Sequence, residues 1–322
     1  MDTPRGDWPG TGTGTGSETG TGRRIGDGNR RRPFVGDGSA SRRRFLAGVS
    51  GAGVAAASGC LGLGLPWRGE NGDGERGEPE ATASWTEAYE PPGGGRVVVE
   101  NLEGPVRIRG EDRGTIEVGV RKRSWDGETP LERTVVNAGV ADGVFAVRTD
   151  HRGTSGETPA TVEVDVSVPR TYPVARASTT NGDVVATDTR GNLSARTVNG
   201  SLEVTGVRGF VGLEATNGDL DVRGTTGIDD LTVSNGHVDA DVRAIRSDTL
   251  VRTANGDVDL RLGPGLDATV RAEAVNGRVE VGEGLSLADA TVASRRVTGR
   301  LGEGKRDLRA ETSTGQITLS SL

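Results

Sequence analysis

The dipeptide Asn-Gly recurs at a nearly constant interval through the C-terminal half of this chain, and this repeat restricts the fold more than any other feature. Two degenerate copies, Thr298-Gly299 and Thr314-Gly315, extend it, and the spacings are 18, 18, 18, 20, 21, 22 and 16 residues. The repeated asparagines are Asn181, Asn199, Asn217, Asn235, Asn255 and Asn276. An interval of this length is typical of a fold that stacks one small unit many times.

Apolar residues occupy fixed positions around each Asn-Gly pair. Aliphatic side chains stand three and five residues after the Asn or Thr and four residues before it in most copies, with polar residues between them. This alternation predicts two strands per unit, joined at the Asn-Gly turn and buried on one face. The third residue after each Asn or Thr is aliphatic in all eight copies: Val184, Leu202, Leu220, Val238, Val258, Val279, Leu301 and Ile317.

Two all-β architectures use such a unit. Asn-Gly is a frequent hairpin turn, so a sandwich of β-hairpins is the alternative. A β-solenoid additionally requires each column to keep one residue class, because equivalent residues stack about 4.8 Å apart. We therefore predict a β-solenoid with rungs of about 18–22 residues. Its interior is slim, since only ten of the 322 residues are aromatic and 32% are hydrophobic.

Three copies share the motif Asn-Gly-Asp-(Val/Leu), at residues 181–184, 217–220 and 255–258. This motif resembles the putative-adhesin family of β-strand-repeat domains, whose function is uncharacterised. The resemblance covers residues 96–322 and is most regular from residue 174. It implies a strand-repeat fold and an adhesin-like role, and it brings no active site. Each repeated Asn is interpreted as a structural turn residue that supplies the left-handed conformation and stacks its amide on the next copy.

Acidic residues form one column between the two inward positions that follow each turn. In a stacked fold they make a stripe at rung spacing: Glu203, Asp221, Asp239, Asp259 and Glu280. We interpret the stripe as a solvated, salt-adapted face, with Arg196 and Arg252 as neighbours that screen it. Divalent cation binding, Ca²⁺ in particular, is an alternative, because carboxylate oxygens suit that ion. No cofactor is otherwise expected.

An extracellular carbohydrate-active enzyme is a second alternative. It would use carboxylates such as Asp219, Asp221 and Asp239, since glycoside cleavage needs a pair of acids. From residue 174 on the repeats hold no Trp or Tyr for sugar stacking, and the single Cys and two His of the whole chain cannot build a Ser or Cys catalytic triad or a zinc site of the usual kind. We therefore assign no catalytic residue.

An export signal is predicted near the N-terminus. Ser41-Arg42-Arg43-Arg44-Phe45-Leu46 resembles a twin-arginine (Tat) signal, in which Arg42, Arg43, Phe45 and Leu46 are the matching residues. Ala57-Ser58-Gly59-Cys60 resembles a lipobox, so Cys60 is the expected lipidation site. The alternative is an uncleaved membrane helix, because residues 45–66 carry no charge and are long enough to span a bilayer.

The sequence divides into four predicted segments. Residues 1–40 form a disordered leader, residues 41–60 the signal, residues 61–95 a flexible acidic Gly/Pro linker, and residues 96–322 the strand-repeat domain. Of the 39 basic residues only Lys122 and Lys305 are lysine, a usage similar to that of halophilic surfaces. Beyond residue 60 acidic residues exceed basic ones, which argues against nucleic-acid binding.

Together these features predict a non-enzymatic, lipid-anchored, adhesin-like module on the outer face of the cytoplasmic membrane. Its expected partners are the membrane, through the lipid anchor, and glycans or proteins of the envelope. One lipid site holds a protein stably only if it carries more than one chain.

The lipid anchor is testable at one residue. Cys60→Ser should release the protein into the medium or stall its processing, because the sulfur that accepts the lipid is gone. Cell fractionation and electrophoretic migration measure both effects. Unchanged membrane retention and migration would count against the anchor.

Overall fold

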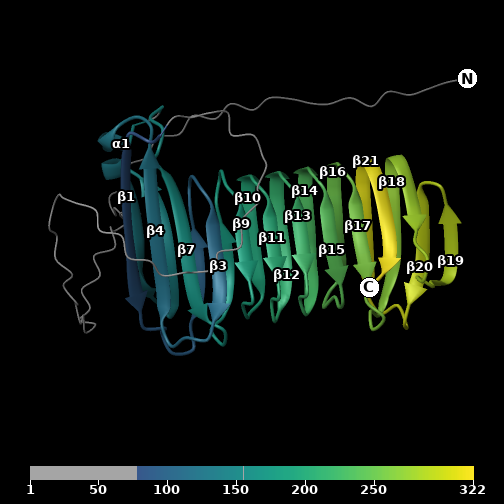
Figure 1. Ribbon diagram of the computed structural model, residues 1–322. Helices are drawn as coiled ribbons and strands as arrows, with labels where there is room; N and C mark the ends of the chain where they lie inside the picture. The colour runs from purple at the N-terminus through teal and green to yellow at the C-terminus, as the bar shows by residue number, and fades with distance from the viewer. Residues whose placement is uncertain (1–77, 155) are drawn as a thin grey trace, which may run out of the picture. The chain divides into compact units, whose positions relative to one another are not determined.

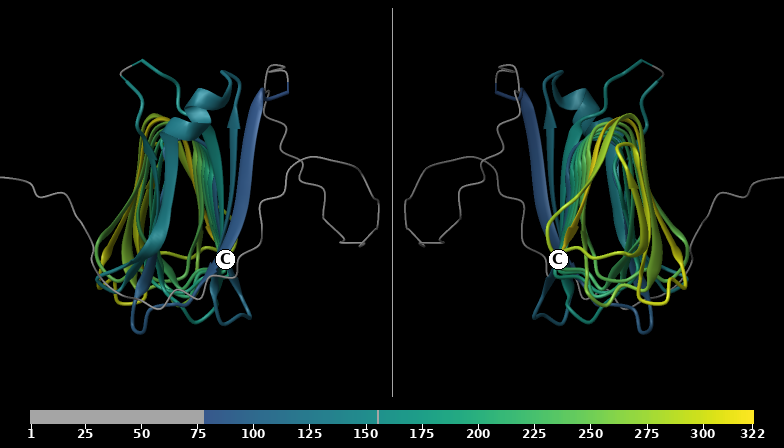
Figure 2. Two further views of the ribbon diagram at one scale, coloured as in Figure 1. Left: turned by 90° about the vertical axis from the view of Figure 1, so that its left-hand side faces the viewer. Right: turned by 90° about the vertical axis from the view of Figure 1, so that its right-hand side faces the viewer.

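The computed structural model describes residues 78–154 and 156–322, which are almost entirely β-strand. Its strands form one 21-stranded sheet that folds into two walls facing each other across an apolar interior (Figures 1 and 2). The end views show the walls approaching each other at one edge and separating towards the other (Figure 2). Within the described residues the helix is α1 (Glu128–Arg133), and none there has the length and apolar character that crossing a bilayer requires.

The predicted signal and lipidation residues lie outside the described residues. These are Arg42, Arg43, Phe45, Leu46 and Cys60. The boundaries predicted for the leader and the signal lie there as well.

The first wall contains the strand that precedes the Asn-Gly turn in each repeat unit. In spatial order it consists of β5 (Thr134–Ala141), β6 (Val144–His151), β2 (Arg96–Glu100), β8 (Val174–Ser178), β10 (Leu193–Asn199), β12 (Phe210–Asn217), β14 (Gly227–Asn235), β16 (Thr249–Asn255), the N-terminal parts of β21 (Asp307–Ser321) and β18 (Ala268–Val281), β20 (Arg296–Leu301) and β19 (Ala288–Ala293).

The second wall contains the strand that follows each turn. In spatial order it consists of β1 (Ala81–Tyr89), β4 (Ile116–Ser124), β7 (Thr161–Pro169), β3 (Val106–Glu111), β9 (Val184–Thr187), β11 (Leu202–Thr205), β13 (Leu220–Arg223), β15 (Val238–Val242), β17 (Val258–Leu262) and the C-terminal parts of β21 and β18.

Equivalent residues of neighbouring rungs pair in parallel and in register. Val184 pairs with Leu202, Leu202 with Leu220, and Leu220 with Val238, and each of the four is at most 1% exposed. Because adjacent repeat strands run parallel, the predicted β-solenoid is confirmed and the hairpin sandwich is excluded. The apolar columns of both walls meet in a single core.

Glycine is required at the corner where the two walls meet. Gly218 has a φ of 137°, and a Cβ built on it would lie 2.0 Å from the carbonyl oxygen of Gly200. The same holds for Gly200 against Gly182, at 2.1 Å. A side chain at this column would therefore collide with the backbone of the rung beneath it, which explains why Gly is repeated.

Buried threonines tie neighbouring rungs together just before that corner. The hydroxyl groups of Thr197, Thr253 and Thr312 each donate to the carbonyl of a corner glycine in the adjacent rung, at 2.9–3.0 Å. These side chains are at most 2% exposed. Each bond satisfies a hydroxyl that would otherwise be costly to bury.

The order of rungs in space differs from their order in the chain at both ends. The rung formed by β2 and β3 lies between the rung of β6 and β7 and the rung of β8 and β9. At the other end β21 lies between β16–β17 and β18, although β18 precedes it in sequence. Figure 1 shows β21 beside β17, ahead of β18.

Because β21 lies between β17 and β18, two predictions from the repeat are wrong. Asn276 stacks on Thr314 rather than on Asn255, and β18 continues through it as one strand without a tight turn. Thr298-Gly299 is not a rung, because it lies within β20, which is antiparallel to β18. The inward residues of β21, such as Leu308 and Ile317, are fully buried in this inner position.

The folded body begins earlier than predicted. Residues 81–89, assigned to the flexible linker, form β1, which pairs antiparallel with β4 over nine positions. No Gly or Pro interrupts the chain from Ala81 to Glu90, and that gap in the linker composition was the available signal. The short helix α1 was also not anticipated.

Candidate functional site

The repeated asparagines form a continuous amide ladder along the corner of the solenoid. The Nδ2 group of Asn199 donates to Oδ1 of Asn181 at 2.7 Å, and the same bond recurs for Asn217, Asn235 and Asn255 at 2.8–2.9 Å. The left-handed φ at these turns belongs to the following glycine, and the non-glycine residues with positive φ are Asp142, Asp188 and Asp289. The left-handed conformation predicted for Asn is therefore wrong, whereas the predicted stacking of its amide on the next copy is confirmed.

A second ladder lies two residues after each Asn, in a column from which sequence analysis considered only Asp219, as an acid for glycoside cleavage. A side-chain atom in each rung accepts the backbone N–H of the equivalent residue in the next rung, at 2.7–3.2 Å. In five successive copies the residue at this position has a side chain that can accept a hydrogen bond. This shared property was the sequence signal for the second ladder. The acceptors are Asp183, Ser201, Asp219, His237 and Asp257.

The predicted acidic stripe lies on the outer face of the second wall. Glu203, Asp221, Asp239 and Asp259 are direct neighbours on successive strands. Glu280 is separated from them because Thr318 of the inserted β21 lies between. The structure thus places four of the five acids in one row.

Arginines of the adjacent column neutralise much of this row. Arg223 contacts the carboxylates of Asp221 and Asp239 at 2.7 and 2.8 Å, and Arg261 contacts Asp239 at 2.6 Å. Arg261 also donates to Asp241 at 2.7 Å. The predicted screening by Arg196 and Arg252 is wrong, because both residues lie on the first wall, in β10 and β16.

Asp221 remains electrostatically strained within the row. Partial burial raises the pKa of its carboxyl group, and the nearby charges of Asp239 and Glu203 raise it further, while Arg223 opposes the shift. Among the residues that the structure describes, no group of three or more His, Cys, Asp or Glu side chains is arranged to hold a metal ion. Within the row, Asp221 and Asp239 are ion-paired.

At Glu163 on β7 the pKa of the carboxyl group is shifted in the opposite direction, below its ordinary value. Burial opposes ionisation of this carboxyl group, but Arg107, Arg123 and Arg121 outweigh it and hold its pKa below the ordinary value. Arg107 forms a close ion pair with Glu163, and Arg123 and Arg121 contact it at 2.8 and 3.2 Å. The Glu163 side chain is only 13% exposed, so these contacts are partly shielded from water.

The carboxylates considered for glycoside cleavage are engaged in structural contacts. Asp219 accepts the backbone N–H of His237 at 2.8 Å, and Asp221 and Asp239 share Arg223. Asp221 and Asp239 are register partners on β13 and β15, and Asp219 lies immediately before β13.

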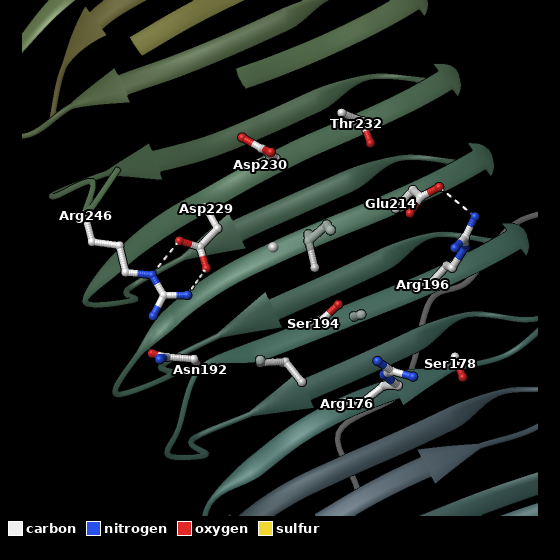
Figure 3. A pocket seen from close by; sticks show the side chains of 14 residues that line it. Arg176, Ser178, Asn192, Ser194, Arg196, Glu214, Asp229, Asp230, Thr232 and Arg246 are labelled. Atoms are coloured by element: carbon white, nitrogen blue, oxygen red, sulfur yellow. Dashed lines mark hydrogen bonds and ion pairs between the residues drawn. The ribbon is translucent and has the colours of Figure 1, made fainter. Parts of the chain in front are cut away.

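A shallow hollow of about 560 Å³ lies on the outer face of the first wall, across β8, β10, β12 and β14 (Figure 3). Small residues form its floor, namely Ser178, Ser194 and Gly212. A β-bulge in β14 places Asp229 and Asp230 beside Gly212, where an added Cβ would lie 3.5 Å from Asp229. The hollow therefore exists because one strand carries an extra residue opposite a residue without a side chain.

Charged side chains of both signs surround the hollow. Arg246 binds Asp229 through two hydrogen bonds of 2.8 and 2.6 Å, and its guanidinium lies 5.1 Å from the Phe210 ring centre. Arg196 contacts Glu214 at 2.7 Å, as Figure 3 shows. These pairs fix the rim in place.

Two other residues of the rim, Asp230 and Arg176, make different contacts. Asp230 accepts the backbone N–H of Leu250 at 2.8 Å, which compensates for the ladder bond that the bulge interrupts. Arg176 has one distant acidic neighbour, Glu100 at 3.8 Å, and its side chain is 61% exposed. Arg176 is thus the rim cation with most freedom to contact another molecule.

Sequence analysis did not find this hollow. The signal was the consecutive pair Asp229-Asp230, which breaks the alternation before the inward Leu231, together with Gly212 in the preceding rung. The hollow could be recognised only with the knowledge that Gly212 and the Asp229-Asp230 pair lie on adjacent strands.

Residues 160–320 match the model of the family described as Toastrack DUF4097. No curated protein matches the chain.

Several solved structures are similar in fold. A putative cell adhesion protein from Clostridium sporogenes is 13% identical, with a TM-score of 0.33 over 75% of this chain and 100% of that one. A putative adhesin from Bacteroides fragilis is 10% identical, with a TM-score of 0.38 over 76% and 100%. A putative lipid binding protein from Parabacteroides distasonis is 8% identical, with a TM-score of 0.36 over 74% and 96%. Similarities this low do not indicate what the chain binds.

The raised pKa of Asp221 has a measurable consequence. Because the folded state holds this proton more tightly than the unfolded chain, the ionised carboxylate lowers the free energy of unfolding at neutral pH. Asp221→Asn should therefore raise the urea midpoint at pH 7. The gain should vanish below about pH 4, where the wild-type carboxyl group is protonated in both states.

Glu163→Gln is the control of opposite sign. In the folded protein the pKa of Glu163 is lowered. The ionised carboxylate therefore stabilises the folded state at neutral pH, and this stabilisation is lost as the pH falls through the folded-state pKa. The substitution should lower stability at pH 7 by about 1 kcal/mol, the scale of a charge-assisted hydrogen bond in a partly exposed site. Shifts of the same sign in both variants would contradict this assignment.

Proposed function

This chain belongs to the Toastrack DUF4097 family, and we propose that it is a non-enzymatic, adhesin-like module of the cell surface that binds an envelope or extracellular component through the outer face of its first wall. The observation that carries the proposal is the polar hollow over β8, β10, β12 and β14, with its floor of small residues and its exposed Arg176.

The chemistry of the hollow favours a glycan as the partner. None of its fourteen lining residues is aromatic, so binding relies on hydrogen bonds and ionic contacts rather than on stacking. Guanidinium groups donate, carboxylates accept, and the hydroxyls of Ser194 and Thr232 do both, a combination that suits a hydroxyl-rich ligand. Small floor residues let such a ligand approach the strand backbone closely.

The solenoid also suits an extended partner. Outward side chains of the first wall repeat at the spacing of hydrogen-bonded strands, about 4.8 Å. A linear polymer lying across the strands would meet several rungs in succession. Such repeated weak contacts add up to useful affinity when they engage together.

Export and anchoring complete the proposal. Arg42 and Arg43 direct the chain to the Tat route, and the sulfur of Cys60 carries the lipid that holds the protein on the outer face of the cytoplasmic membrane. The support is the order of charged, apolar and small residues before Cys60. The Gly-, Pro- and acid-rich segment between Cys60 and β1 serves as the tether.

A binding screen with the purified chain against glycans and envelope fractions tests the proposal. Arg176→Ala should weaken binding about 10-fold or more, because it removes a charge-assisted contact worth about 1.5–3 kcal/mol. Arg252→Ala is the matched control, since Arg252 is also exposed on the first wall but does not line the hollow. Absence of any binding partner, or equal loss in both variants, would contradict the proposed function.

A further inference from the structure

The first wall ends at both sides in a strand with almost no charge. β5 has eight residues and β19 has six, and the only charged residue among them is Asp289. The whole chain, by comparison, is 26% charged. Exposed edge strands are normally protected from pairing with other chains by charged residues, proline or β-bulges. β5 has none of these, and β19 has only Asp289 and the irregular register between Ala288 and Thr291.

Both end strands are paired on one side only within the described part of the chain. β5 pairs with β6, and β19 pairs with β20. Every residue of β19 is exposed, and Val292 is 64% exposed. On β5, Val140 is 52% exposed.

The two exposed valines continue the apolar interior. Val292 pairs with Val297 and Val140 pairs with Phe145, and both partners are fully buried on the inner side of the first wall. Cross-strand partners project from the same face of a sheet. The core therefore ends at each side on a valine that faces inward but has no further rung to cover it in the described residues.

The strand directions at the two ends are compatible with end-to-end pairing. β5 is antiparallel to β6, which runs in the direction shared by the first-wall strands of the rungs. β20 is antiparallel to β18, and β19 is antiparallel to β20, so β19 again runs in the shared direction. If a second copy follows the first in the same orientation, β19 of one copy meets β5 of the next as an antiparallel pair.

The ends also have complementary steps. At the β5 end the second wall extends two strands beyond the outermost complete rung, β4 and β1, whereas the first wall extends one. At the β19 end the first wall extends two strands, β20 and β19. The second wall has none there, although Ser294 accepts the N–H of Val279 along its edge. The second wall thus projects further at the β5 end, and the first wall projects further at the β19 end.

We propose that this chain assembles head to tail, with β19 of one copy adding to β5 of the next so that the first wall and its core continue from copy to copy. The occupant of each edge is a second copy of the same chain. Because the interface joins two different surfaces, it does not stop at a two-fold dimer, and it extends into an open filament unless the rotation between copies closes a ring.

Edge-blocking variants test the assembly directly. Val140→Lys and Val292→Lys each place a charge on one inner edge, and Val198→Lys is the matched control, because Val198 is 39% exposed on β10, far from either end strand. All full-length chains carry Cys60→Ser so that lipid does not contribute to association. Sedimentation velocity over a range of concentrations at fixed ionic strength gives the mass of the assemblies.

The reference chain and Val198→Lys should grow in mass with concentration, whereas Val140→Lys and Val292→Lys should each stay monomeric. An equal mixture of the two blocked variants should form a heterodimer and nothing larger, because each supplies the edge that the other lacks. That mixture also shows that both variants are folded. A monomeric reference chain, continued assembly of either blocked variant alone, or no heterodimer on mixing would overturn the proposal.

Discussion

The parallel, in-register pairing of equivalent residues is the constraint on which the rest of this structure depends. Once Leu202 lies on Val184 and Leu220 lies on Leu202, every other column must also stack like upon like. At the corner this brings backbones so close that only glycine fits, as at Gly218 above Gly200. The same register aligns the asparagine amides for their ladder. A core one or two side chains wide is sufficient because each rung covers the next.

Stacking like upon like also sets the surface electrostatics. A carboxylate repeated at one position creates a row of neighbouring negative charges, and the row persists here because Arg223 and Arg261 reach across from the adjacent column. At Asp221 partial burial raises the pKa of the carboxyl group, and Arg223 compensates for it only in part. The hollow to which we assign binding arises where the chain departs from the repeat. The bulge in β14 and the missing side chain at Gly212 open it.

The repeat was sufficient to predict the fold class and the buried columns, because burial alternation and turn spacing are local properties of the sequence. It was not sufficient to predict the order of the rungs. β21 lies between β17 and β18 and pairs residues 59 apart in the chain, such as Val258 and Ile317, and a repeat of similar units does not specify such an exchange of order. The hollow was missed for a related reason, because Asp229 and Gly212 become neighbours only after stacking.

Disulfide trapping between outward positions of the first wall tests the in-register stack most directly. Arg252 and Glu311 are paired neighbours on β16 and β21, whereas Glu273 lies one strand further away on β18. With Cys60 replaced by Ser, Arg252→Cys with Glu311→Cys should form an intramolecular disulfide on mild oxidation. Arg252→Cys with Glu273→Cys should not, because two strand spacings of about 9.6 Å exceed the reach of a disulfide. The reverse result, or equal cross-linking of both pairs, would contradict the account.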